Sequence, residues 1–303
     1  EQDAGYATRE AGDLVRSLDP TFRPIDVKIG PDGALYIADW SNPIIQHGEV
    51  DFRDARRDKV TGRIWRVTYK GRAALPLMDL RAMSQTELLD QLLTGHGERQ
   101  KQVRRVLTER GAVIGRDLEA WRMAHPQTPA QLQALWMYQS LNQVEPTLLR
   151  SLLEDEDGRI RAAGVRVLSF WQESLPDGEA LLAARVKDTH PRVRLEAIRA
   201  LAKFGTGWAA ATALQVLEQP MDRFLDYALW LTMNDLAAPW VDAVASGAWK
   251  VSEENRAALE FGLTAIPGNQ AAQILEPMTA SLHPNALAEG PWMQLIAKAG
   301  TRS

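Results

Sequence analysis

The chain has 303 residues, enough for two domains or for one extended repeat array. Its apolar content of 45% and charged content of 24% are those of an ordinary globular protein. Acidic residues number 39 against 35 basic ones, which argues against nucleic acid as a partner, because nucleic-acid binders carry a basic excess. The absence of cysteine excludes disulfides, thiolate metal sites and covalently attached c-type haem. No apolar run approaches the roughly 18 residues that a membrane span needs.

The first part of the chain has the pattern of β-strands. Apolar and polar residues alternate over 25–29, and the turn tripeptide Pro-Asp-Gly follows at 31–33. Further strands are predicted over 34–39 and 64–69. Three short strands do not form a domain by themselves, so we expect strand partners that precede residue 1 or belong to another chain. The missing starting Met likewise indicates a piece of a longer protein.

From Ser84 onward the apolar period becomes helical, and the sequence repeats itself. The segment 155–168 matches the segment 188–201, and the small residues Gly164 and Ala197 occupy equivalent places 33 residues apart. A repeat of this length is typical of a solenoid, in which each helix pair buries its apolar face against its neighbours.

The repeated pattern Asp-x-x-x-x-Val-Arg-x-x-Ala-x-x-Ala-Leu resembles the second-helix motif of HEAT repeats. We therefore predict a mainly α fold, a HEAT-type α-solenoid preceded by a short antiparallel β segment. The predicted domains are residues 1–72 and residues 73–303.

Charged residues recur at equivalent places in the two clearest repeats. In HEAT arrays such arginines tie adjacent repeats to the Asp at the preceding turn, so we assign a structural role to Asp155, Arg161, Asp188 and Arg194. The two carboxylates are expected to accept hydrogen bonds from helix-start amides or from an Arg of the neighbouring repeat. The tryptophans of the helical region are expected to fill the stack, with one or two available on its concave face as binding anchors.

Three stretches of the β region carry a further resemblance, at 22–40, 45–54 and 62–67. Together they resemble the end of the membrane-bound dehydrogenase domain of planctomycete and verrucomicrobial multidomain proteins. That domain is a β-propeller similar to the soluble glucose and sorbosone dehydrogenases, and HEAT repeats and a haem domain follow it. The resemblance implies that residues 1–72 are the terminal blade of a propeller.

The same resemblance implies a parent that is an exported, periplasmic sugar or alcohol dehydrogenase. Its cofactor would be pyrroloquinoline quinone with calcium, or haem in a separate domain. The Cys-x-x-Cys-His motif of that haem domain does not occur in this chain, so we expect no cofactor in the chain itself.

The loop between the second and third predicted strands, residues 40–61, is the best candidate for a chemical site. It is long and dense in polar groups. His47 could act as a base or ligand, and Asp51 and Asp54 could hold a hard cation such as calcium. The alternative is that the Arg and Asp side chains of the loop pair with one another and pin the loop onto the first helices.

Two functions from different classes remain. The first is a scaffold that binds a protein partner, or a neighbouring propeller or haem domain, without catalysis by this chain alone. The second is a dehydrogenase to which the 40–61 loop contributes part of the active site. A third reading, a HEAT-like binder of damaged DNA, is disfavoured by the acidic balance.

Overall fold

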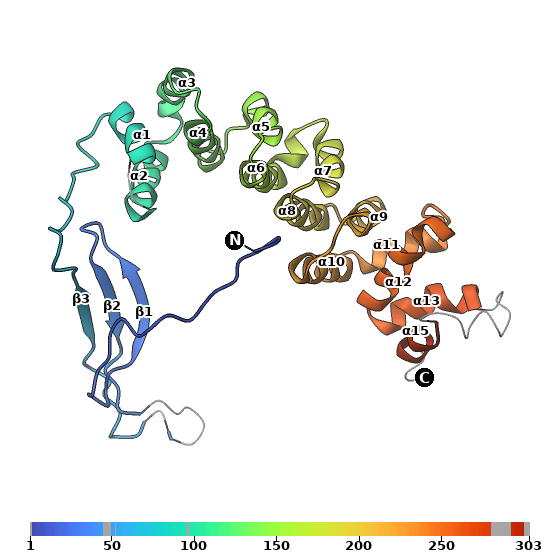
Figure 1. Cartoon of the computed structure of the whole chain (residues 1–303), viewed down its shortest axis with the longest axis horizontal. Coiled ribbons are helices and arrows are strands. Elements are labelled where there is room, and N and C mark those ends of the chain that lie inside the picture. Colours follow the sequence, from blue (N-terminus) through green and yellow to red (C-terminus); the bar gives the residue numbers. More distant parts are fainter. Residues whose placement is uncertain (1, 45–49, 52, 95–96, 280–291, 300–303) are drawn as a thin grey trace. The chain divides into compact units, whose positions relative to one another are not determined.

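The computed structural model describes residues 2–44, 50–51, 53–94, 97–279 and 292–299 (Figure 1). Helices account for 59% of the chain, which confirms the mainly α fold class with a small antiparallel sheet ahead of the repeats. Two compact units are present. The solenoid unit combines Glu1–Thr8 with Ala134–Ser303, and the sheet unit is Arg9–Gln133.

The sheet unit contains three antiparallel strands in the order β1-β2-β3. They are β1 (Pro24–Ile29), β2 (Leu35–Asp39) and β3 (Arg63–Val67). The turn from β1 to β2 contains Gly33 with a φ of 74°, a conformation that glycine adopts without the steric penalty of a side chain. The strand ends lie within two residues of the predicted ones.

One face of this sheet is apolar and open to solvent. The register places Val27 opposite Ile37 and Ile37 opposite Trp65, so the three side chains share a face. Ile29, Leu35 and Val67 lie in the next row of the same face. All six residues of β1 are exposed, and Trp65 is 44% exposed. Val27, Ile29 and Trp65 therefore remain exposed beside an open strand edge, whereas Ile37 on the same face is buried.

Helices α1 (Gln85–Thr94), α2 (Gly97–Arg110) and α3 (Gly115–Ala124) also belong to the sheet unit. Their buried side chains are the leucines that the helical period predicts, together with Trp121, whose Nε1 donates to Asp90 at 2.8 Å. The boundary between the units falls within α4 (Thr128–Ser140).

The solenoid unit is built of helices of 8 to 14 residues with short connections. They are α5 (Pro146–Leu153), α6 (Gly158–Trp171), α7 (Gly178–Val186), α8 (Pro191–Leu201), α9 (Gly207–Leu214), α10 (Arg223–Asp235), α11 (Ala237–Ala245), α12 (Arg256–Ala265), α13 (Gly268–Thr279) and α15 (Trp292–Ala299). Helices α5 with α6, α7 with α8 and α9 with α10 pack as pairs. None of the described helices has the length and apolar character needed to cross a membrane.

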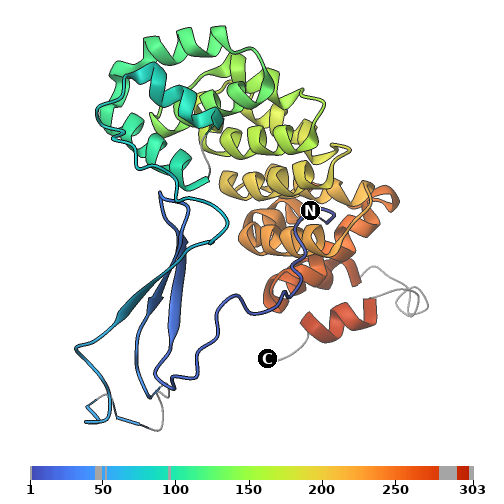
Figure 2. The same cartoon turned by 60° about the vertical axis from the view of Figure 1, so that its left-hand side comes forward.

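These pairs stack so that helices of the same kind are neighbours (Figures 1 and 2). Helix α8 contacts α6 on one side and α10 on the other, and α10 contacts α12. Helix α9 contacts α7 and α11 in the same way, and α11 contacts α13. We call α6, α8, α10 and α12 the even layer, which holds the second helix of each clear repeat.

Small residues allow neighbouring helices to approach closely, as the repeat pattern predicts. Gly164 and Ala197 are both buried, which confirms the prediction for the two equivalent positions. A Cβ added at Gly158 would lie 2.3 Å from the ring of His190 in the next repeat, and one added at Gly262 would lie 2.3 Å from Trp240. The close stacking therefore depends on glycine at these two places.

Candidate functional site

The 40–61 loop is held by its own polar side chains. His47 lies outside the described residues. The Asp51 carboxylate accepts the Arg53 N–H at 2.7 Å. The Asp54 carboxylate accepts two side-chain hydrogen bonds and one backbone hydrogen bond from Arg56, at 2.8–3.0 Å. The Arg56 guanidinium keeps the pKa of Asp54 well below its usual range.

Two buried residues anchor this loop. The Arg57 guanidinium donates to the carbonyls of Val50 at 2.8 Å and Asp51 at 3.0 Å. The Asn42 side chain donates to the carbonyl of Asp58 at 3.2 Å. Both Arg57 and Asn42 are almost fully buried. The described part of the loop is therefore held by Arg57 and Asn42 through carbonyls of the loop itself.

The loop carboxylates do not form a cation site in the part of the chain that the structure describes. Asp51 and Asp54 take separate partners, and the described residues contain no group of three or more His, Asp or Glu side chains that could hold a metal ion. Calcium needs six to eight oxygen ligands around one point. The described donors therefore do not fit calcium, and no chemical step is assigned to such an ion.

Asp39, at the end of β2, is the centre of the polar network in the sheet unit. Its buried carboxylate accepts the backbone N–H of Arg23 at 2.8 Å, the Arg63 Nε at 2.8 Å and the Trp65 Nε1 at 2.8 Å. Burial alone raises the pKa of Asp39, but these donors together hold the pKa below its usual value. A carboxylate with so many fixed donors stabilises the sheet and has no free oxygen for catalysis.

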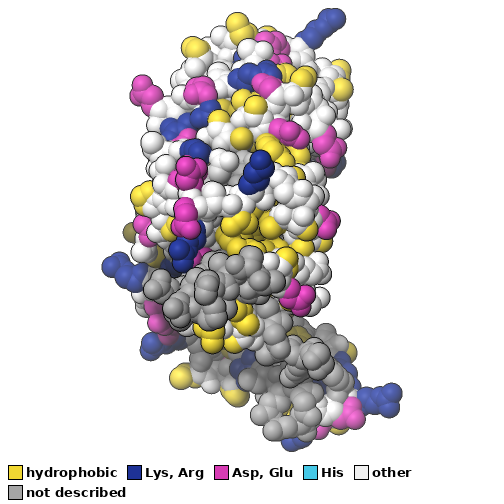
Figure 3. Space-filling view, turned by 90° about the vertical axis from the view of Figure 1, so that its right-hand side faces the viewer, with side chains coloured by type: hydrophobic (Ala, Val, Ile, Leu, Met, Phe, Trp, Pro, Cys, Tyr) yellow, Lys and Arg dark blue, Asp and Glu magenta, His cyan; other side chains and the backbone are white. Residues whose placement is uncertain are grey.

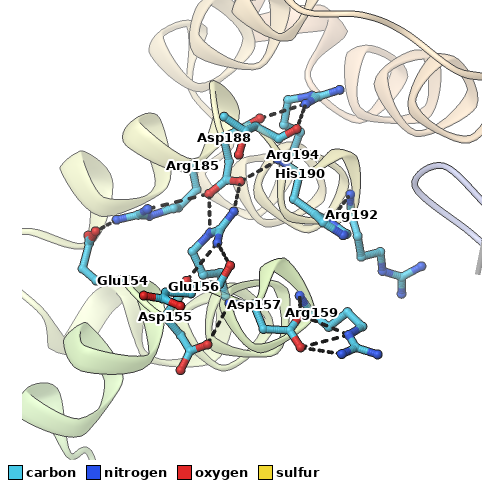
Figure 4. A network of polar contacts seen from close by, with 12 residues as sticks. Glu154, Asp155, Glu156, Asp157, Arg159, Arg185, Asp188, His190, Arg192 and Arg194 are labelled. Atoms are coloured by element: carbon cyan, nitrogen blue, oxygen red, sulfur yellow. Dashed lines mark hydrogen bonds and ion pairs between the residues drawn. The ribbon is translucent and has the colours of Figure 1, made fainter. Parts of the chain in front are cut away.

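In the solenoid unit, Arg161 of α6 and Asp188 form an ion pair between adjacent repeats (Figure 4). The guanidinium donates to both carboxylate oxygens, at 2.9 and 2.6 Å, and the side chains are only 13% and 4% exposed. The same carboxylate accepts the His190 N–H at 2.8 Å, at the start of α8. Burial raises the pKa of Asp188, and the Arg161 and His190 hydrogen bonds outweigh that effect and lower the pKa.

The repeat-equivalent residues make a related set of contacts. The Asp155 carboxylate accepts the Asp157 N–H at 2.9 Å. Arg194, which corresponds to Arg161, donates to the carbonyls of Asp188 at 2.8 Å and Pro220 at 2.8 Å. Each arginine thus bonds to a carbonyl of its own preceding turn and reaches the following turn through its other nitrogens. The sequence-predicted Asp155, Arg161, Asp188 and Arg194 lie together in one line of contacts along the repeats.

The exposed side of the even layer carries aromatic side chains. Phe170 of α6 and Tyr227 of α10 are each 62% exposed, and Trp230 of α10 is 42% exposed. The rings of Tyr227 and Trp230 stack with centroids 5.8 Å apart. Trp171 and Trp240 are buried, so the helical tryptophans divide between the core and the surface. Exposed aromatic rings of this kind are common anchors in protein interfaces.

Basic side chains of α6, of α8 and of the residues just after α8 make one ring contact and two ion pairs in the even layer. Lys203, just after α8, lies 4.2 Å from the centroid of the Phe170 ring. Arg166 of α6 lies 3.8 Å from Glu196 of α8. Arg199 of α8 donates to Asp235 at 3.0 Å. We call this set the even-layer surface, made up of Arg166, Phe170, Arg199, Lys203, Tyr227 and Trp230.

The face of the molecule seen from the right-hand side of Figure 1 carries mixed charges. Figure 3 looks at the right-hand side of Figure 1 and shows acidic and basic groups interspersed with hydrophobic side chains, without a field of one sign. A surface groove of about 520 Å³ is lined by Leu214, Trp249 and Ala258 among others. This distribution is not that of a phosphate-binding surface.

Sequence reasoning missed two features of the site. One is the Asp39 network, because its members Arg23, Arg63 and Trp65 are far apart in sequence and spacing gave no signal for it. The even-layer surface was missed because the exposed aromatic rings belong to different helices. The helical period was the available signal, because it places Ala228 on the buried side of α10 and Tyr227 and Trp230 on the exposed side.

This arrangement of paired helices, with a small residue at the seam and an Arg–Asp contact between repeats, defines an α-solenoid of the HEAT class.

Comparison with protein families agrees, because a family model described as HEAT repeats matches residues 144–224. A second family model, described as a domain of unknown function (DUF7133), matches residues 2–71. No curated protein matches the sequence. Among solved structures, the crystal structure of an engineered protein is 15% identical with a TM-score of 0.33, and the match covers 74% of this chain and 97% of that one. A TM-score this low adds nothing to the fold assignment.

Proposed function

We propose that the chain is a protein-interaction scaffold and that the even-layer surface binds its partner. The HEAT-repeat match indicates a protein-interaction scaffold in general. The observation that supports this particular surface is the exposure of Phe170 on α6 and of Tyr227 and Trp230 on α10, the two helices that flank α8. Exposed rings on a rigid stack offer large contact areas at low entropic cost.

The charges of the even-layer surface favour an acidic partner segment with apolar anchors. Arg166 has a side chain that is 67% exposed and only a 3.8 Å contact to Glu196. Lys203 lies at the surface beside the Phe170 ring. A partner carboxylate near these cations would speed association and fix the register, while its apolar side chains cover the rings.

The test is site-specific photo-crosslinking with a reactive amino acid in place of Tyr227, compared with the same amino acid at exposed Glu179 on α7. We expect a discrete crosslinked protein from position 227 only, and at least a tenfold loss of that product on Trp230→Ala. Equal products from both positions would contradict the assignment of the surface. Recovery of nucleic acid instead of protein would favour the DNA-binding reading.

In finer terms, we propose that this scaffold follows a dehydrogenase-like β-propeller in an exported parent and contacts that propeller or a haem domain. The support is the resemblance of the β region together with the exposed apolar side chains Val27, Ile29 and Trp65. A sheet with one uncovered apolar face normally packs against another layer. Further strands of a propeller would supply that layer.

The alternative is that the parent oxidises a sugar or alcohol and that the 40–61 loop forms part of its active site. One observation favours this alternative: the loop is long and polar, and the buried Arg57 and Asn42 hold it in place. His47 would be its catalytic base or ligand. The activity assay described in the Discussion separates this alternative from the scaffold.

A further inference from the structure

Residues 2–6 form a tight turn that lies against the starts of α8 and α10 (Figures 1 and 2). Gln2 and Gly5 exchange two backbone hydrogen bonds, of 2.9 and 3.0 Å. Asp3 has a φ of 51°, which fits a two-residue turn between them. The segment is therefore a defined structure and not an extended tail.

The solenoid binds both backbone groups of Ala4. The Ala4 N–H donates to Oδ2 of Asp222 at 3.0 Å, and the Ala4 carbonyl accepts from Nη1 of Arg192 at 3.1 Å. The other oxygen of Asp222 caps α10 by accepting the N–H groups of Phe224 at 2.8 Å and Leu225 at 3.0 Å. One carboxylate thus serves the helix start and the turn together.

The side chains of the turn also fit the solenoid closely. Ala4 is 0% exposed, so its methyl group is fully enclosed. A Cβ at Gly5 would lie 2.7 Å from the Phe224 ring, which leaves no space for any other residue. The Tyr6 ring lies 5.8 Å from the Arg192 guanidinium. The contacts therefore select a small residue followed by glycine, and the largely exposed Tyr6 ring adds a contact to Arg192.

The site extends beyond the turn. A groove of about 410 Å³ borders Asp3 and is lined by Thr189, Pro220 and the buried Arg194 among others. The Nε of Arg194 is buried without a hydrogen-bond partner. The groove has room for peptide residues next to the turn.

We propose that the starts of α8 and α10 form a peptide-recognition site for an Asp-Ala-Gly-aromatic turn, and that residues 2–6 are its intramolecular ligand. The site is distinct from the even-layer surface and does not depend on the function proposed for that surface. A tethered ligand binds in an intramolecular step, so the resident segment competes with a free peptide for the site.

The test measures binding of a fluorescent peptide with the sequence of residues 1–8 to the full chain. Ala4→Arg places a long charged side chain where a methyl group is enclosed, and so releases the resident segment while leaving the solenoid wall unchanged. We expect the peptide to bind this variant at least tenfold more tightly than the wild type. The matched peptide with Arg at the Ala4 position should not bind.

Asp222→Asn provides the control on the wall. The amide keeps an oxygen that can cap α10, but its NH₂ group then faces the Ala4 N–H. Added to the Ala4→Arg chain, it should weaken peptide binding at least tenfold. Peptide binding that is equal with and without Asp222→Asn, or absent from the Ala4→Arg chain at several millimolar peptide, would overturn the proposal.

A second measurement examines the resident segment directly. The chain has no cysteine, so Ala7→Cys accepts a single spin label. We expect restricted label motion in this chain and fast motion once Asp222→Asn is added. Fast motion in both chains would refute the docking, and a dimeric mass that becomes monomeric on Ala4→Arg would show that the occupant comes from a second copy.

Discussion

The ion pair between Arg161 and Asp188 offers the sharpest test of how the repeats are held together. Asp188→Ala removes a carboxylate whose side chain is 4% exposed, and it leaves the Arg161 guanidinium, 13% exposed, without its anion. Breaking a buried pair in this way costs about 3–5 kcal/mol. Arg161 keeps the carbonyls of Asp155 and Glu156 as acceptors, which reduces the loss. The lost hydrogen bond from the His190 N–H adds about 1 kcal/mol. We expect a total near 3 kcal/mol.

The matched control is Asp157→Ala in the turn before α6. Asp157 caps Arg159 and pairs with it, but the two side chains are 36% and 69% exposed. Because exposed pairs contribute little, this variant should lose about 1 kcal/mol, mainly from the cap.

Equilibrium urea unfolding followed by circular dichroism gives the free energy of each variant, and hydrogen exchange of α6 and α8 locates the change. A double-mutant cycle of Asp188→Ala with Arg161→Ala should show a coupling of about 2 kcal/mol. A coupling below about 0.5 kcal/mol, or an Asp188→Ala loss no larger than that of Asp157→Ala, would refute the reasoning.

Four further outcomes are expected. Ala197→Leu should overpack the seam and cost about 1–3 kcal/mol, seen as a lower melting temperature. Gly262→Ala should also lower the melting temperature, because the added Cβ would lie 2.3 Å from the buried Trp240. This loss is expected although alanine favours helix more than glycine does. An unchanged melting temperature would contradict the packing. Hydrogen bonds from Arg159 lower the pKa of Asp157 to about 2, below its unfolded value of 3.8. The stability that this carboxylate contributes is therefore present above pH 3.8 and is lost as the pH falls to 2. Asp157→Asn should reduce that loss in a pH series of unfolding curves. Finally, an artificial-electron-acceptor assay on sugars and alcohols, with pyrroloquinoline quinone and calcium supplied, should show no turnover by this chain, whereas turnover that His47→Ala abolishes would favour the dehydrogenase alternative.

Local patterns were sufficient to predict the helices and the repeat. The match between 155–168 and 188–201 predicted that Gly164 and Ala197 would be equivalent and buried, because a helix seam repeats with the sequence. The strands were also predictable, since alternation over a few residues sets each face.

Partners that meet only in the folded chain were harder to predict. Arginines at the repeat positions were expected to contact the Asp of the preceding turn. Arg161 instead binds that turn through the Asp155 carbonyl and gives its bidentate contact to Asp188, in the following turn. The distance between one repeat and the next in the stack decides which carboxylate an arginine can reach. The spacing of residues in the sequence does not give that distance. The docking of residues 2–6 had no sequence signal, because Ala4 and Asp222 are 218 residues apart.

That separation has a consequence for the order in which the chain matures. During synthesis residues 2–6 leave the ribosome long before Asp222 and α10 have been made. At about 5–20 residues per second, the interval is roughly ten to forty seconds. The sheet unit and the first helix pairs can fold during that time, whereas the turn at Ala4 has nowhere to bind. Closure of the chain onto α8 and α10 is therefore a late event, and nascent chains that stop before residue 222 lack it altogether.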